Sequence, residues 1–107
     1  MSYTNQYTPE TLSRDELDQT AGPMVIEFGT NWCGFCQGAQ ADIRAAMDKH
    51  PDVRHVKVED GKGRRLGRTF GVKLWPTLIF LRNGEEMARL VRPESSNNIE
   101  GALRKIQ

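Results

Sequence analysis

Two kinds of hydrophobic pattern alternate along this chain. Residues 24–28 and 77–81 are short apolar runs with β-branched members, which predict buried strands. Over 33–49 the apolar residues recur every three or four positions, and this spacing predicts an amphipathic helix that ends before Pro51. The chain therefore combines buried strands with helices that can cover them.

Weaker patterns predict further elements in the first two thirds of the chain. Residues 53–58 alternate loosely and predict another buried strand, and Ser13 with Glu16 fits a capping box at the start of a short helix over 14–19. Residues 1–10 are weakly patterned, as a loose segment or a short first strand would be. The glycine-rich stretch 61–68 is typical of a short helix or an irregular crossover.

The last third of the chain predicts a hairpin followed by a helix. Asn83-Gly84 is the strongest short signal for a hairpin turn, and it separates the run at 77–81 from an expected return strand at 87–91. After the polar cluster at 95–98, apolar residues at helical spacing predict a C-terminal helix. This order of elements favours an α/β fold, a three-layer sandwich in which helices flank both faces of a mixed central β-sheet.

Length and composition narrow the class of protein. The 107 residues suit one domain over 1–107, without repeats or linkers. Fifteen Lys and Arg against fourteen Asp and Glu give a net charge of +1, which offers no argument for binding to nucleic acid or an anionic membrane. No apolar run approaches the roughly 20 residues that span a bilayer, and the polar start is unlike a secretory signal. A cytoplasmic protein is therefore expected.

The two cysteines lie in one four-residue stretch, Cys33-Gly34-Phe35-Cys36, between a predicted buried strand and a predicted helix. A helix N-terminus offers free backbone N–H groups and a partial positive charge, and both stabilise a thiolate. We therefore expect Cys33 to be the thiolate that attacks a disulfide. Cys36 lies one helical turn further on, so it is placed to resolve the mixed disulfide and release the substrate.

Other uses of the cysteine pair remain open from the residues alone. A four-cysteine zinc site needs two more cysteines than the chain has. His50 and His55 could supply ligands in principle, but His50 lies at the far end of the predicted helix, on the order of 20 Å away. A pair of inert buried cysteines is the other alternative, because cysteine is a common core residue. No metal site is expected.

The residues around the pair resemble the thioredoxin family. Trp32-Cys33-Gly34-Phe35-Cys36 resembles the thioredoxin active-site motif, 25–28 looks like the strand before it, 71–78 looks like the segment that carries the cis-proline, and 82–85 looks like the hairpin turn. The resemblance covers about three quarters of the chain. It implies a thioredoxin fold and a thiol–disulfide oxidoreductase that works without a cofactor.

The resemblance also implies which residues bind the substrate. Pro76 corresponds to the cis-proline beside the disulfide, and Trp75 would pair through its backbone with an extended peptide. Trp32, Gly34 and Phe35 would complete the substrate surface. From the residues alone, Pro76 is equally an ordinary trans-proline at a strand start, and Trp32 a plain exposed aromatic.

Glu27 is the one carboxylate inside an apolar run, and the resemblance places it at a buried acid beneath the cysteines. Burial predicts a raised pKa for Glu27, which would let it take the proton from Cys36, through water, when Cys36 attacks the mixed disulfide. Alternation along the strand puts Glu27 on the same face as Val25. Lys57 corresponds to the lysine near this acid and would temper the shift. The alternative is that Glu27 reaches the surface and Lys57 is solvated.

Besides Trp75, which replaces a smaller aliphatic residue, four positions depart from the usual thioredoxin pattern. Phe35 replaces a proline and restores an N–H donor near the cysteines, which predicts a more oxidising couple, whereas Gln37 replaces a lysine and acts in the opposite direction. Gly29 stands where thioredoxins carry a second tryptophan, and Arg92 stands where they carry a glycine. These changes leave the expected thiol–disulfide chemistry intact, but they affect which partner proteins the surface around the cysteines can bind.

We therefore expect an oxidoreductase that reduces or exchanges protein disulfides and serves electron transport and cell redox homeostasis. It would act as a monomer on disulfide-containing proteins, with a thioredoxin reductase as electron donor. Two alternatives stay open: an oxidant or isomerase of protein disulfides, and a thioredoxin-fold binding module whose cysteines only switch its conformation. The basic stretch 61–68 matches no phosphate-loop pattern and is expected to be a solvated surface, at most a docking patch for an acidic partner.

Overall fold

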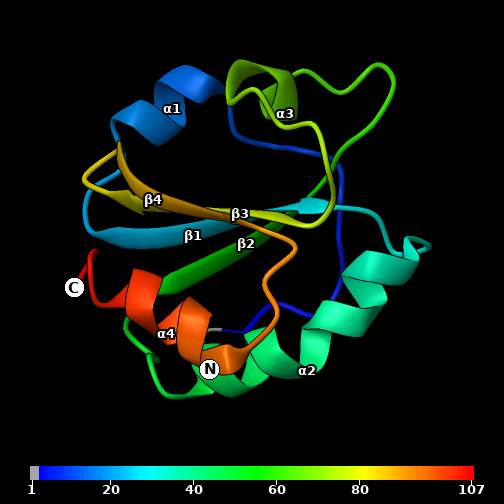
Figure 1. The fold of residues 1–107 in the computed structure, drawn as a ribbon. Helices are drawn as coiled ribbons and strands as arrows, with labels where there is room; N and C mark the ends of the chain where they lie inside the picture. The colour runs from blue at the N-terminus through cyan, green and yellow to red at the C-terminus, as the bar shows by residue number, and fades with distance from the viewer. Residues whose placement is uncertain (1–2) are drawn as a thin grey trace.

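The computed structural model describes residues 3–107, and its centre is a four-stranded mixed β-sheet (Figure 1). The elements follow the order α1 (Arg14–Asp18), β1 (Pro23–Gly29), α2 (Gly34–Asp48), β2 (Arg54–Glu59), α3 (Leu66–Thr69), β3 (Thr77–Arg82), β4 (Glu85–Val91) and α4 (Ser96–Leu103). This order confirms the predicted α/β fold, with most predicted element ends shifted by at most two residues, whereas α3 begins five residues after the start of the stretch 61–68. Met1 and Ser2, part of the expected first segment, lie outside the described residues.

The strand that leads to the cysteines lies in the interior of the sheet. The strand order is β2-β1-β3-β4, with β1 parallel to β2 and antiparallel to β3. This pairing places Glu27 opposite Lys57 on one side and opposite Leu78 on the other. Asn83 and Gly84 have φ angles of 50° and 81°, so the predicted Asn-Gly turn joins β3 to β4.

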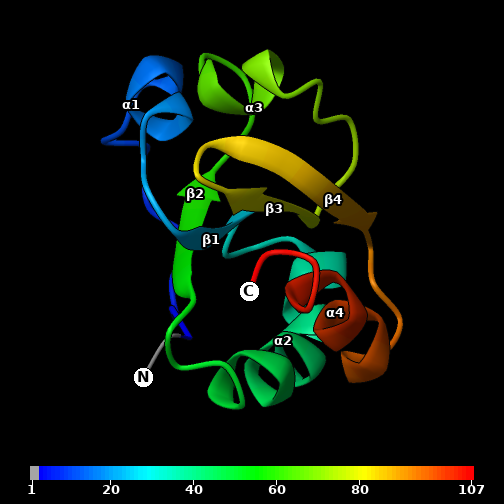
Figure 2. The same ribbon diagram turned by 90° about the vertical axis from the view of Figure 1, so that its left-hand side faces the viewer.

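Helices cover both faces of the sheet, with α1 and α3 on one face and α2 and α4 on the other (Figures 1 and 2). The residues of β1 alternate between two apolar clusters. Val25 packs into the cluster on the α2 side, whereas Ile26 and Phe28 pack into the cluster that contains Phe70. Glu27 shares the face of Val25, as the alternation predicts, and its carboxylate therefore points toward α2.

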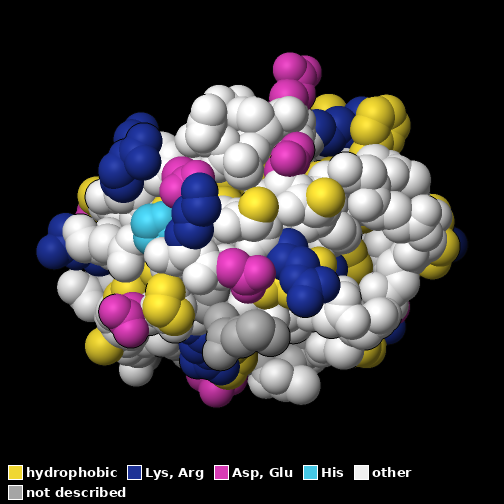
Figure 3. Space-filling model, turned by 90° about the horizontal axis from the view of Figure 1, so that it is seen from below, with side chains coloured by type: hydrophobic (Ala, Val, Ile, Leu, Met, Phe, Trp, Pro, Cys, Tyr) yellow, Lys and Arg dark blue, Asp and Glu magenta, His cyan; other side chains and the backbone are white. Residues whose placement is uncertain are grey.

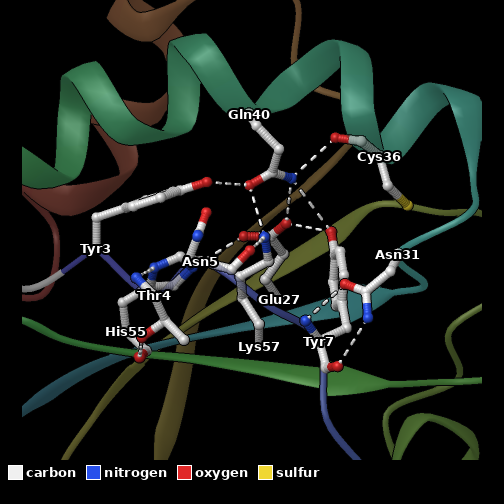
Figure 4. Close-up of polar contacts among 10 residues, drawn as sticks. All are labelled: Tyr3, Thr4, Asn5, Tyr7, Glu27, Asn31, Cys36, Gln40, His55 and Lys57. Atoms are coloured by element: carbon white, nitrogen blue, oxygen red, sulfur yellow. Dashed lines mark hydrogen bonds and ion pairs between the residues drawn. The ribbon is translucent and has the colours of Figure 1, made fainter.

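The segment before α1 runs along the outer edge of β2. Thr8 forms a parallel bridge with Val58, and its carbonyl oxygen accepts a hydrogen bond from the Glu59 N–H at 2.7 Å. The pattern of residues 1–10 predicts either a loose segment or a short first strand, and the described part of this segment pairs with β2 as a short strand would. This pairing holds Tyr3 and Tyr7 over the side of the sheet that carries Glu27 (Figure 4).

The face formed by α2 and α4 carries acidic and basic side chains that intermingle, without a large area of one sign (Figure 3). In the part of the chain from residue 3 onward, no helix combines the length and the apolar character needed to cross a bilayer.

Candidate active site

The two cysteines lie where the chain leaves β1 and enters α2. Cys33 is the N-cap residue, and its Sγ accepts a hydrogen bond from the Cys36 backbone N–H at 3.3 Å. The helix N-terminus therefore faces the Cys33 sulfur, as the spacing predicts. Both residues are free thiols, and Cys33 is 8% exposed whereas Cys36 is 1% exposed. Reagents in solution thus reach Cys33 first.

The Cys36 thiol is strongly biased toward its protonated form. Burial raises the pKa of Cys36 to about 12, and the hydrogen bond with Cys33 adds to this rise. Hydrogen bonds with the Thr30 backbone and with the Tyr7 hydroxyl lower the pKa without offsetting burial. Cys36 therefore needs a group that removes its proton before it can attack a disulfide.

Glu27 is fully buried, and donors surround its carboxylate (Figure 4). Oε1 accepts a hydrogen bond from His55 Nε2 at 2.8 Å, and Oε2 accepts one from Gln40 Nε2 at 2.8 Å and another from the Tyr7 hydroxyl. The Thr4 backbone N–H donates to His55 Nδ1 at 2.8 Å, which leaves Nε2 as the nitrogen that carries the donated proton. Both carboxylate oxygens are thus fixed by donors.

The expected rise in the pKa of Glu27 is wrong. Burial acts to raise this pKa, but the hydrogen bond from His55, the nearby charge of Lys57 and the hydrogen bond from Tyr7 together lower it. The prediction rests on burial alone, because nothing in the sequence shows that Tyr7 and His55 face Glu27. Glu27 is therefore an anion at neutral pH and a weaker base than the sequence predicts.

Lys57 is buried near Glu27, as predicted, although the β2 side chain that hydrogen-bonds the Glu27 carboxylate is His55. Lys57 Nζ donates to Gln40 Oε1 at 2.7 Å and to the Asn5 carbonyl at 2.9 Å. Burial lowers the pKa of Lys57, and the charge of Glu27 opposes that shift. By binding Oε1 of Gln40, Lys57 holds the amide so that Nε2 faces Glu27.

Two tryptophans form the surface beside the cysteines. Trp32 is 75% exposed, and its ring meets the edge of the Trp75 ring with centroids 5.8 Å apart. Trp75 packs against the cluster that contains the cysteines, and its Nε1 donates to Asp60 Oδ2 at 2.8 Å. The Trp75-Pro76 bond is cis, as the resemblance implies.

Arg92 connects Phe35 to Trp75. Its Nε donates to the Trp75 carbonyl oxygen at 2.8 Å, and its guanidinium carbon lies 3.8 Å from the centroid of the exposed Phe35 ring. Arg92 and Phe35 also line a surface groove with Gly34 and Pro93. The carbonyl predicted to pair with a substrate backbone is thus already occupied in this structure.

Gly29 lies where no side chain fits. A Cβ at this position would lie 2.6 Å from Cys36 Sγ and 2.9 Å from the Tyr7 hydroxyl oxygen. The space beside residue 29 is thus filled by Tyr7 and Cys36, which explains the glycine. Tyr7 is absent from the predicted site, and an aromatic residue in a polar segment is the only sequence signal that could have suggested it.

The histidines do not join the cysteines. His55 contacts Glu27, and His50 contacts Glu100 and Gln107 beyond the far end of α2. Within the described 105-residue range from 3 to 107, no three His, Cys, Asp or Glu side chains gather as metal ligands would.

A dithiol at the start of a helix, directly after a central strand and next to a cis-proline, is the arrangement of thioredoxin-fold thiol–disulfide oxidoreductases. The sequence model of the thioredoxin family matches residues 5–105. The chain belongs to the thioredoxin family, which confirms the resemblance found in its motifs.

Solved structures and curated relatives agree with this assignment. Thioredoxin 2 from Pseudomonas aeruginosa PAO1, solved in its reduced form, is 53% identical, with a TM-score of 0.86 and coverage of 97% of this chain and 96% of that one. Thioredoxin 1 of Nostoc sp. is 24% identical over 98% of both chains. Thioredoxin H2 of Arabidopsis thaliana is 29% identical over 75% of this chain, and the match spans 60% of that longer protein.

Proposed function

We propose that this protein reduces protein disulfides through Cys33 and Cys36. The observation that carries the proposal is the N-cap position of Cys33, whose sulfur receives a helix N–H and is the more exposed of the two. The Cys33 thiolate attacks a substrate disulfide, forms a mixed disulfide and expels one substrate thiolate. Cys36 then attacks the Cys33 sulfur and releases the second thiolate. Two electrons pass to the substrate, and the pair becomes a disulfide.

The proposed substrate surface lies around the Cys33 sulfur. The exposed rings on both sides and the backbone before the cis-proline suit an extended peptide that carries a disulfide. Arg92 has to release the Trp75 carbonyl before a peptide can pair with it. The substrate-binding residues in this proposal are Trp32, Gly34, Phe35, Trp75 and Pro76.

Glu27 accepts the proton of Cys36 in this proposal, and Lys57 keeps the Gln40 amide in place beside it. Glu27 is ionised and buried on the same side of the sheet as Cys36, which supports this role. Its lowered pKa makes the transfer brief, so the proton stays on Glu27 only while the Cys36 sulfur attacks. The departing substrate thiolate takes the proton afterwards.

The oxidised pair needs two electrons before the next cycle. A thioredoxin reductase is the proposed donor, and disulfide-containing proteins are the proposed acceptors. The cytoplasm as the place of action and the monomer as the active form stay predictions from the sequence.

The decisive experiment measures insulin-disulfide reduction together with the reduction potential of the Cys33–Cys36 couple. We expect turnover and a potential roughly 30 to 60 mV above the thioredoxin value of about −270 mV. A potential of about −180 to −120 mV would instead identify an isomerase or an oxidant. Stable retention of a partner without turnover of any disulfide would identify a binding module.

The order of the two cysteines is tested separately. Alkylation of the reduced protein near neutral pH should label Cys33 faster than Cys36, because Cys33 is more exposed and Cys36 is held as a thiol. Cys36→Ser should accumulate the mixed disulfide, and Cys33→Ser should not. Equal labelling, or faster labelling of Cys36, would reverse the roles.

A further inference from the structure

Tyr7 is a buried tyrosine fixed beside the cysteine pair. Its side chain packs with both cysteines in one cluster and is 4% exposed. Two hydrogen bonds with the Asn31 side chain hold its backbone, the N–H donating to Oδ1 at 2.9 Å and the carbonyl accepting from Nδ2 at 3.1 Å. Asn31 belongs to the turn that leads from β1 to the cysteines. The ring is thus held by the same loop that positions Cys33.

The Tyr7 hydroxyl lies between Glu27 and Cys36. It donates a hydrogen bond to Glu27 Oε2, and its oxygen accepts a long one from Gln40 Nε2 at 3.4 Å. A Cβ placed on Gly29 would lie 2.6 Å from Cys36 Sγ and 2.9 Å from the Tyr7 hydroxyl oxygen. Because both atoms lie this close to one point, the sulfur and the oxygen are at most about 5.5 Å apart. The hydroxyl therefore lies beside the thiol, and each shifts the pKa of the other: Cys36 raises the pKa of Tyr7, and Tyr7 lowers the pKa of Cys36.

Within residues 3–107, no hydrogen bond joins the Glu27 carboxylate to Cys36. The carboxylate is held by Gln40, His55 and Tyr7. Of these three, Gln40 reaches only the backbone carbonyl of Cys36, at 2.8 Å, and an amide N–H cannot pass on a thiol proton. Of the three, Tyr7 is the residue that also packs in one cluster with Cys36.

We propose that Tyr7 is a catalytic residue of the second chemical step, and that it passes the proton of Cys36 to Glu27. This inference rests on the proposed oxidoreductase function and adds a residue to it. As the Cys36 sulfur attacks the Cys33 sulfur, the Cys36 proton moves to the Tyr7 oxygen and the Tyr7 proton moves to Glu27 Oε2. A bond forms between the two cysteine sulfurs, and the bond between Cys33 and the substrate sulfur breaks.

The balance of this step leaves Tyr7 unchanged. The electron pair of the broken bond leaves with the substrate thiolate, and the proton held by Glu27 returns through Tyr7 to a thiolate or to solvent. Burial raises the pKa of Tyr7, so the hydroxyl stays protonated before and after the step. During the attack the hydroxyl donates to the developing Cys36 thiolate, which stabilises the sulfur charge.

Other charged and titratable groups surround this path. Lys57 Nζ lies 4.3 Å from the centroid of the Tyr7 ring, His55 binds Glu27, and the Cys33 sulfur accepts a hydrogen bond from the Cys36 N–H. A cavity of about 150 Å³ borders Tyr7 and Cys36 and gives water a second way to the thiol. Without the hydroxyl, loss of the Cys36 proton depends on hydroxide in solution.

The experiment follows formation and decay of the mixed disulfide separately, in single-turnover reactions with a disulfide peptide from pH 6 to 9. Tyr7→Phe keeps the ring and removes the hydroxyl. We expect formation at the wild-type rate and decay slowed about tenfold or more at pH 7. The decay rate of the variant should rise about tenfold per pH unit, because the pKa of Cys36 lies far above this range, whereas the wild-type rate should rise less steeply.

Tyr3→Phe is the matched control. Tyr3 lies on the same segment and its hydroxyl donates to Gln40 Oε1 at 2.7 Å, but Lys57 also fixes that oxygen. We expect wild-type decay in this variant. In the Glu27→Gln, Tyr7→Phe double variant the two losses should not add, because both residues serve one path.

Two results would overturn the inference. One is decay of the Tyr7→Phe mixed disulfide at the wild-type rate and pH slope, and the other is full additivity with Glu27→Gln. Either result leaves the proposed function intact. Absence of mixed-disulfide formation in the wild type would contradict the proposed function itself.

Discussion

At the scale of single residues, Arg92 is the largest departure from the thioredoxin pattern. Its φ of 51° lies in the left-handed region, which costs a residue with a Cβ about 1 to 2 kcal/mol. The hydrogen bond to the Trp75 carbonyl and the cation–π contact with Phe35 offset this cost. Arg92 therefore occupies the Trp75 carbonyl, with which a substrate backbone is predicted to pair.

Arg92→Gly should make the predicted peptide-binding backbone accessible. The substitution releases the Trp75 carbonyl and removes the backbone strain, so we expect Cys33 to attack an uncharged disulfide peptide several-fold faster and the free energy of unfolding to stay equal or rise. Arg92→Ala is the control, because it removes the guanidinium and keeps the strain. Rates at or below the wild-type value in both variants would show that Arg92 assists substrate binding.

The sequence predicts the residues whose roles depend on near neighbours in the chain. Cys33 and Cys36 form a local motif, and Pro76 precedes a clear apolar run. The direction of the Glu27 pKa depends on His55 and Tyr7, which lie 28 and 20 residues away. Such partners are fixed by strand register and packing, so the sequence predicts the burial of Glu27 but not its charge state.

At the scale of elements, the start of α2 controls the balance between dithiol and disulfide. Cys33 caps this helix, and Phe35 occupies its second position, where thioredoxins carry a proline. A proline in the first turn fits the helix but removes one N–H from the region that stabilises the reduced sulfur. The reduced form then loses stability relative to the disulfide.

Phe35→Pro should therefore lower the reduction potential toward the thioredoxin value of about −270 mV. One hydrogen bond to a charged group contributes about 1.5 to 3 kcal/mol, which corresponds to a shift of roughly 30 to 60 mV. Equilibration with glutathione or a reference thioredoxin measures the potential. Phe35→Ala is the control, because it keeps the N–H and removes the ring that contacts Arg92. An equal shift in both variants, or a rise in Phe35→Pro, would contradict the role of the N–H.

Elements with a local signal agree with their sequence predictions. Ser13 and Glu16 form the expected capping box, and Asn83-Gly84 forms the expected turn. The N-terminal segment has no such local signal. It is held in place by the bridge from Thr8 to Val58 and by side-chain hydrogen bonds, and these partners lie far away in the sequence. A segment stabilised only by distant partners gives no periodic pattern, and for this reason the sequence does not predict that Tyr7 belongs to the site.

At the scale of the whole molecule, the polar network around Glu27 joins the N-terminal segment, β1, β2 and α2 (Figure 4). Its effect on stability follows from the direction of the pKa shift. The pKa of Glu27 is lower in the folded protein than its ordinary value of 4.5, so the unfolded chain binds the proton more readily. The stabilisation is present above pH 4.5 and is lost as pH falls through the folded-state pKa.

Glu27→Gln should lower the free energy of unfolding at pH 7 by about 2 kcal/mol, because an amide has one acceptor oxygen where the carboxylate has two, so its NH2 group would face a donor. Urea denaturation between pH 3 and 8 measures the difference from wild type, which should stay level down to about pH 5 and shrink at lower pH. Glu85→Gln, an exposed carboxylate on β4, is the control and should change little at any pH. If the pKa of Glu27 were raised, the variant would instead gain stability relative to wild type as pH rises from 5 to 8. That outcome would support the prediction from the sequence, in which a raised pKa makes Glu27 a stronger base for the Cys36 proton.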